Sequence, residues 1–84
     1  MARIYKYQSI KNSVAKMSVE ALVGEFNRQV GLNGWTSARA VHNVTMIKTF
    51  IKKGVDVSAI YDGVTISFAR KIALNEDKTR LIFA

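Results

Sequence analysis

The chain has 84 residues, 49% of them apolar, and a formal net charge of +7 at pH 7. This length and composition predict one domain, residues 1–84, with a small hydrophobic core rather than a disordered chain. The absence of cysteine excludes disulfides and thiolate metal sites, and no apolar run approaches the roughly 20 residues that span a bilayer. The first residues lack the apolar stretch of a signal peptide, so we expect a cytoplasmic protein with no membrane partner.

The first 17 residues are basic, and their pattern is ambiguous. Residues 3–7, Arg-Ile-Tyr-Lys-Tyr, alternate and are rich in aromatic side chains, which favours a strand. In residues 9–17, Ile10, Val14 and Met17 have helical spacing. A basic loop is the alternative interpretation of this segment.

A helix is predicted over residues 18–30. Ser18 can cap its start, and Glu20 lies in the first turn, where a negative charge suits the helix dipole. One face carries Val19, Leu22, Val23, Phe26 and Val30. Gly31 ends the helix, and the segment Leu32-Asn-Gly34 predicts a short turn that folds the next helix back against this one.

The second predicted helix, over residues 37–53, is the most clearly marked element. Thr36 or Ser37 can cap its start, and Gly54 suits the position just after its end. The expected buried stripe comprises Ala40, Val44, Ile47 and Ile51, widened by Val41 and Phe50, with His42, Thr45, Lys48, Thr49, Lys52 and Lys53 on the opposite face. Trp35, just before the cap, either folds back onto the first turns or exposes its ring for stacking.

The C-terminal third has the period of β-structure. Residues 55–61 fit a short strand or an irregular return, and Asp62-Gly63 predicts a tight turn. Residues 64–74 alternate like a half-buried strand, except that Arg70 falls on the apolar side, where a bulge, a lack of helix cover or a buried ion pair would explain it. Residues 75–79 form a polar loop before a final strand over 80–84.

These elements predict an α+β fold, a small two-layer domain. Two helices, about 18–30 and 37–53, pack on an antiparallel sheet made mainly of the C-terminal hairpin, about 64–74 and 80–84, which a strand over about 3–7 would extend. The order of elements over residues 18–84 resembles part of a winged-helix domain, with residues 36–54 as the recognition helix and residues 75–79 as the wing tip. A complete winged helix has one more helix at its start, which residues 9–17 would have to supply.

The charge is unevenly distributed along the chain. Residues 1–17 and residues 36–54 each carry +4 with no acidic residue, whereas residues 18–35 carry −1 and residues 55–84 are neutral. If the two basic segments lie side by side, they form a surface suited to nucleic acid. The candidate contacts are Lys11, Lys16, Arg39, His42, Asn43, Lys48, Lys52 and Lys53, which combine phosphate-binding and base-reading side chains.

Catalytic chemistry has little support in the sequence. His42 is the one histidine, and the spacing of the acids does not suggest a triad with Asp56 or Asp62. We therefore expect His42 to be a solvated surface residue. The paired acids Glu76 and Asp77 lie in the expected hairpin tip without further metal ligands. The sequence predicts a small basic non-enzymatic domain, without cofactor or metal, that binds DNA or RNA or has a regulatory role.

The alternative function is protein interaction or self-association. The final strand carries apolar residues on both faces, Leu81 and Phe83 on one and Ile82 on the other. An open strand edge of this composition invites pairing with another chain, so a homo-oligomer without any nucleic-acid role is the competing prediction.

Overall fold

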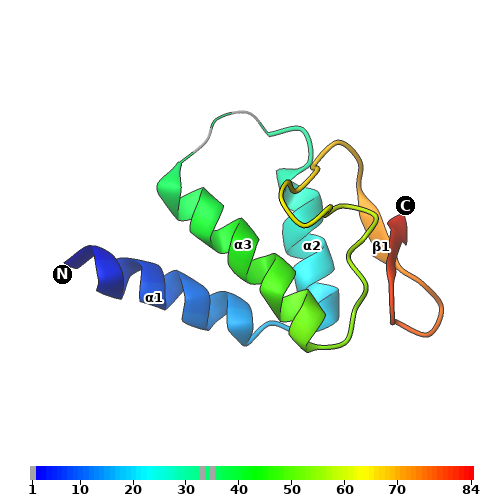
Figure 1. Ribbon diagram of the computed structural model, residues 1–84, viewed down its shortest axis with the longest axis horizontal. Helices are drawn as coiled ribbons and strands as arrows, with labels where there is room; N and C mark the ends of the chain where they lie inside the picture. The colour runs from blue at the N-terminus through cyan, green and yellow to red at the C-terminus, as the bar shows by residue number, and fades with distance from the viewer. Residues whose placement is uncertain (1, 33, 35) are drawn as a thin grey trace.

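The computed structural model describes the backbone of residues 2–32, 34 and 36–84, and the side chains of these residues from Tyr7 onward. In this part of the chain three helices precede a two-stranded antiparallel sheet (Figure 1). The elements are α1 (Ala2–Ala15), α2 (Val19–Gln29), α3 (Ser37–Lys52), β1 (Ile72–Leu74) and β2 (Leu81–Phe83). The predicted α+β class is confirmed. Among the described helices, none is long and apolar enough to cross a membrane.

The prediction of a strand over residues 3–7 was wrong, because this segment belongs to α1. Residues 9–17 were expected to be either a helix or a basic loop, and residues 9–15 belong to the same helix, α1. Val14 lies in the core, and Ile10, one helical turn earlier, packs against it together with Met17, which follows the end of α1.

The helix ends follow local rules that the sequence displays. The Ser18 hydroxyl accepts a hydrogen bond from the backbone N–H of Ala21 (3.1 Å), and the Thr36 hydroxyl accepts one from that of Arg39 (3.0 Å). Gly54 follows the last turn of α3 with φ +83°, a conformation that glycine adopts without strain. The expectations for Asn33 and Trp35 concern residues outside the described part of the chain.

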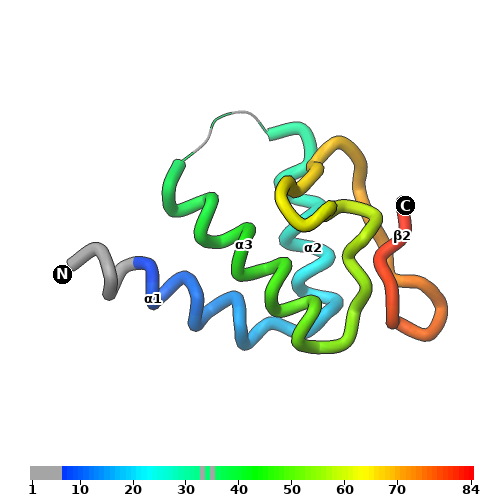
Figure 2. The backbone as a smooth tube through the Cα atoms, viewed as in Figure 1, coloured from blue at the N-terminus to red at the C-terminus, as the bar shows by residue number. Residues whose placement is uncertain are grey.

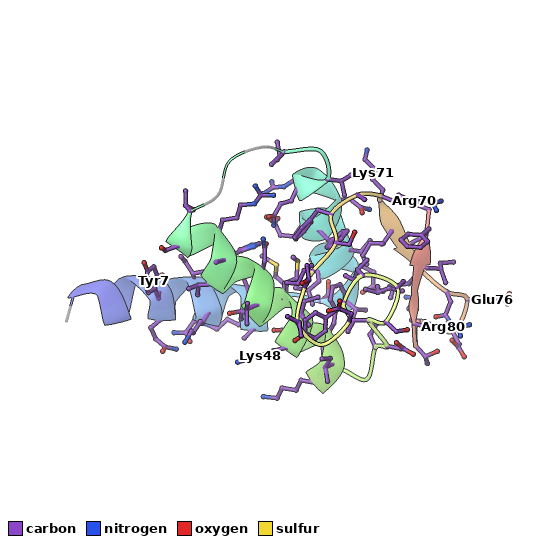
Figure 3. All side chains as sticks on the ribbon, turned by 45° about the horizontal axis from the view of Figure 1, so that its top comes forward. Tyr7, Lys48, Arg70, Lys71, Glu76 and Arg80 are labelled. Carbon is purple, nitrogen blue, oxygen red and sulfur yellow. The ribbon has the colours of Figure 1, made fainter. Side chains whose placement is uncertain are left out.

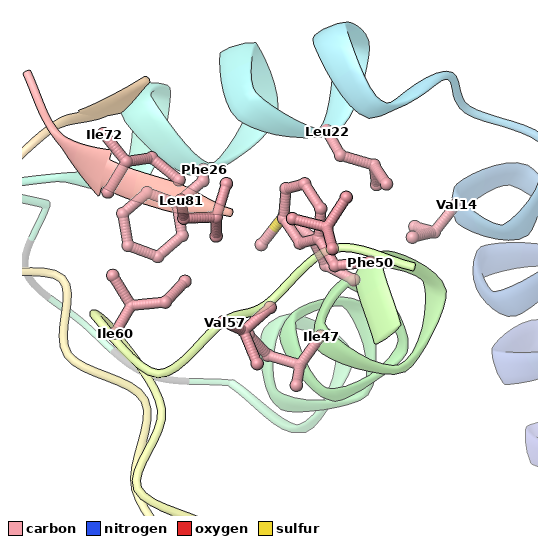
Figure 4. Packing of buried hydrophobic residues seen from close by; sticks show 11 residues of the cluster. Val14, Leu22, Phe26, Ile47, Phe50, Val57, Ile60, Ile72 and Leu81 are labelled. Atoms are coloured by element: carbon pink, nitrogen blue, oxygen red, sulfur yellow. The ribbon is translucent and has the colours of Figure 1, made fainter. Parts of the chain in front are cut away.

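The core gathers one or more residues from every element (Figure 4). Its members are Val14, Leu22, Phe26, Met46, Ile47, Phe50, Val55, Val57, Ile60, Ile72 and Leu81. The ring of Phe26 also stacks on that of Phe68, with ring centroids 4.6 Å apart. Residues 53–71, which return from α3 to β1 (Figure 2), therefore supply part of the core themselves.

The inner face of α3 differs from the predicted stripe. Asn43, Met46, Ile47, Thr49 and Phe50 are its buried residues. Val44 and Ile51, expected inside, are 47% and 53% exposed. The polar Asn43 occupies a core-facing position. The buried Thr49 hydroxyl donates a hydrogen bond to the Thr45 carbonyl (2.7 Å), so it is not left without a partner. The helix is therefore rotated about its axis relative to the orientation that apolarity alone predicts.

The hairpin is shorter than predicted. The strand expected over residues 64–74 is limited to Ile72–Leu74, and the partner over 80–84 to Leu81–Phe83, with Ala73 opposite Ile82. The preceding residues turn instead of extending, since the Asp62 carboxylate accepts the backbone N–H groups of Val64 and Thr65 (2.9 and 2.7 Å). The hydrogen bond from Thr65, followed by that from Val64, holds the pKa of Asp62 below its ordinary value. Tyr61 and Ile66 form an isolated antiparallel bridge across this turn, as its Asp-Gly sequence predicts.

Each outer edge of the small sheet is paired at one strand residue, Ile72 on β1 and Leu81 on β2. The side chain of Asn27 on α2 pairs with Ile72 as a strand would: its Oδ1 accepts the Ile72 N–H (2.8 Å) and its Nδ2 donates to the Ile72 carbonyl (2.9 Å). On the other edge, Asp56 donates its N–H to the Thr79 carbonyl and accepts from the N–H of Leu81. Asn27 thus fixes α2 on the sheet.

We predict that Asn27→Ala lowers the free energy of unfolding by about 1–3 kcal/mol, because it leaves two backbone groups of the buried Ile72 without their partner. Chemical denaturation measures this change. The control is Asn12→Ala on the exposed side of α1, which should change stability by less than about 0.5 kcal/mol. Equal effects of the two substitutions would contradict the role given to Asn27.

Candidate nucleic-acid interface

The two acid-free segments of the sequence pack against each other as α1 and α3 (Figure 1). Between them runs a shallow groove of about 280 Å³. Lys11 from α1 and Lys48 from α3 both line it, together with Ala40, Val41, Val44 and Thr45. The side-by-side arrangement that the charge pattern required is therefore present in the fold.

The other lysines of the candidate set differ in position. Lys52 lies four residues after Lys48, so it shares the same face of α3. Lys53 is the C-cap residue of α3 and is exposed. Lys16 borders a different hollow on α1, with Gln8, Ser9, Asn12 and Ser13. We use the term basic face for Lys11, Lys48 and Lys52, and Lys16 lines the other hollow.

Within the described residues, no ion pair engages the basic face. The acids of α2 are paired elsewhere: Glu25 accepts from Arg28 at 2.6 Å and Glu20 accepts from Lys78 at 2.7 Å. The hydrogen bond from Lys78 lowers the pKa of Glu20 and raises that of Lys78. Lys11, Lys48 and Lys52 thus present positive charge without a neutralising carboxylate on their own helices.

Arg39 faces α2 instead of the basic face. Its Nε donates to the Gln29 Oε1 (2.9 Å), and one guanidinium nitrogen donates to the Gly34 carbonyl (2.6 Å). Its guanidinium carbon also lies 5.7 Å from the centre of the Phe68 ring. These contacts connect the start of α3 to the end of α2 and to residues 62–71.

His42 is likewise directed toward α2, and the Asn43 side chain contacts the His42 ring. The Nδ1 of His42 lies 3.3 Å from both the Gln29 Nε2 and the Asn43 Oδ1, and its Nε2 lies 3.8 Å from the Glu25 Oε1. Asn43 is buried and the His42 side chain is only 22% exposed. The structure does not bring these base-reading candidates together with the lysines, and His42 is less solvated than expected.

The candidate protein-interface residues lie on β2, whose outer edge is paired at Leu81. Leu81 is buried, and its backbone N–H is bonded to Asp56. Ile82 and Phe83 are partly exposed, and the guanidinium of Arg70 lies 4.4 Å above the Phe83 ring. Arg70 precedes β1 and is exposed, so its place in the alternating pattern reflects this stacking and no buried ion pair is involved.

Sequence reasoning missed a group of exposed apolar residues beside α3. Leu32, Val44, Ile51 and Val64 are large hydrophobic residues with exposed side chains, and all four line two adjoining hollows between α3 and residues 61–68. No pattern in the sequence indicated this group. Val44 and Ile51 were assigned to the buried stripe of the helix, Val64 to the apolar side of a half-buried strand, and Leu32 to a turn.

Among the described residues, no three His, Asp or Glu side chains are grouped so that they could hold a metal ion. Comparisons of the chain with protein-family models, curated proteins and solved structures found no match.

We predict that Arg39→Lys lowers the free energy of unfolding by about 1 kcal/mol, because lysine cannot make both directed hydrogen bonds of the guanidinium. The same substitution leaves the charge unchanged and should not alter affinity for a labelled DNA duplex. Arg28→Lys, on the exposed side of α2, is the matched control for stability. Loss of duplex affinity without loss of stability would show instead that Arg39 contacts nucleic acid.

Proposed function

We propose that the protein is a non-enzymatic nucleic-acid-binding domain that contacts phosphates through the basic face of α1 and α3. The observation that supports this proposal is the packing of two acid-free helices, with Lys11 and Lys48 on one shared groove. Flexible lysine side chains on a common surface suit the evenly spaced charges of a nucleic-acid backbone. Each contact releases counterions from the nucleic acid, which favours binding at low salt.

The contacts of Arg39, His42 and Asn43 favour binding without strong sequence preference. Reading a base requires donors and acceptors that reach its edge, and these three side chains already have partners within the domain. The outward positions of α3 next to the lysines are Val41, Val44 and Thr45. We therefore propose recognition of the backbone, with base composition as a minor factor.

The order of elements gives secondary support. Three helices followed by a hairpin occur in the same order in winged-helix domains, and α1 supplies the initial helix that this resemblance needed. The lysines supply the proposed contacts, since Arg39 and His42 point toward α2, whereas a base-reading recognition helix directs such side chains outward.

The test combines Lys11→Glu with Lys48→Glu. This variant should bind a fluorescein-labelled duplex and a labelled single strand at least about tenfold more weakly at low salt, because it replaces two attractions by repulsions. Both residues are exposed, so the melting temperature should stay within a few degrees. Fluorescence anisotropy and thermal unfolding measure the two quantities.

The charge-matched control is Lys71→Glu with Arg80→Glu. These exposed residues lie at the end of the molecule away from Lys48 (Figure 3). The control carries the same net charge as the test variant and should retain most of the affinity. Equal losses in the two variants would mean that net charge alone attracts the nucleic acid, and the proposed face would be rejected.

A further inference from the structure

An apolar groove lies on the side of α3 that faces residues 61–68. It consists of two adjoining hollows, of about 440 and 120 Å³. Val44, Val64 and Ile66 line both hollows, which makes them one continuous surface. Leu32 and Phe68 extend it toward the start of α3, and Ile51 and Tyr61 extend it toward the end.

The exposure of this groove is unusual for a domain with so small a core. Val64 is 89% exposed, Leu32 59%, Ile51 53% and Val44 47%. Of the large hydrophobic residues that are exposed in the described part of the chain, only Ile82 and Phe83 lie outside the groove. A clustered apolar surface of this kind marks a site where another molecule binds.

Apolar residues of α3 that could be buried in the core are exposed on this surface. Val44 and Ile51 have the helical spacing of a buried stripe, yet α3 turns Asn43 and Thr49 inward in their place. The Asp62 carboxylate holds the turn that presents Val64, by accepting the backbone N–H groups of Val64 and Thr65. Such a departure from the pattern that stability favours is expected at a functional site.

The charges around the groove favour an acidic occupant. Arg39 lines one hollow and Lys48 the other, and Lys48 also lines the neighbouring groove between α1 and α3 together with Lys11. The neighbouring acid is Asp62, whose carboxylate is already bonded to two backbone N–H groups. A second copy of this chain, docked by its own groove, would bring another surface lined by Arg39 and Lys48 against the first, and the repulsion between like charges disfavours self-association through this face.

We propose that this groove binds an acidic amphipathic helix of another protein. Apolar side chains at helical spacing would fill the hollows between Val44 and Val64, and carboxylates on the flanks would meet Lys48 and its neighbours. This is the helix-in-groove mode of recognition, in which a few apolar anchors supply most of the affinity. The two proposals share Lys48, but the apolar variants that test this one retain every lysine, so the failure of one can be distinguished from the failure of the other.

The probe is a synthetic helix-forming peptide of about 16 residues with leucine at four positions of one face and glutamate on the flanks. Binding is measured by calorimetry with the full chain, and the contacts are mapped by backbone amide NMR. Combining Val44→Thr with Val64→Thr should weaken binding at least about tenfold. Threonine has nearly the shape of valine, but its hydroxyl makes the surface that receives the leucine side chains polar. A peptide with lysine in place of each glutamate should bind at least about tenfold more weakly than the acidic one.

The control is Ile82→Thr, a similar exposed residue outside the groove, which should leave peptide affinity unchanged. NMR changes should centre on Val44, Ile51 and Val64. Changes that centre on the hairpin, or equal binding by the test and control variants, would overturn the proposal. A dimer in sedimentation that the Val44 and Val64 substitutions dissociate would also overturn it, because the occupant would then be a second copy.

Discussion

The burial of Met46, Ile47 and Phe50 on one side of α3 is the constraint on which the rest of the structure depends. Phe50 and Met46 are fully buried, and they meet core residues from α1, α2, the return after α3 and both strands. The many β-branched residues of α3 make it a poor helix in isolation, so these contacts hold it. Because they set the rotation of the helix, they also decide which side chains face outward.

Two surfaces follow from this single rotation. Toward α1, it places Lys48 across a groove from Lys11. Toward residues 61–68, it leaves Val44 and Ile51 beside the exposed Val64. Val44 borders both surfaces, so a ligand on one face lies close to a ligand on the other. The side chains of Arg39 and His42 point inward and contact Gln29, which connects α3 to α2.

The sequence predicted what depends on neighbouring residues. Ser18, Thr36 and Gly54 act within one turn of their helices, and the Asp62-Gly63 turn is equally local. The predictions failed where contacts between residues distant in the sequence determine the structure. Residues 3–7 have strand-like composition, but Val14 and its neighbours pack as a helix beside α3. The rotation of α3 was hidden because Asn43 and Thr49 are polar, and their inward position depends on contacts that no local pattern records. The acid-free segments were recognised as basic from the sequence. That Lys11 and Lys16 line different hollows depends on how α1 packs, which the sequence does not display.

The measurement that tests the central claim most directly is the affinity of the unmodified protein for a labelled duplex across a salt titration. If Lys11, Lys48 and Lys52 each contact a phosphate, the logarithm of the association constant should fall against the logarithm of salt concentration with a slope near 3, about 0.9 for each contact. Absence of binding at low salt, or binding with a slope near zero, would contradict the account, since the basic face would then be an ordinary solvated surface.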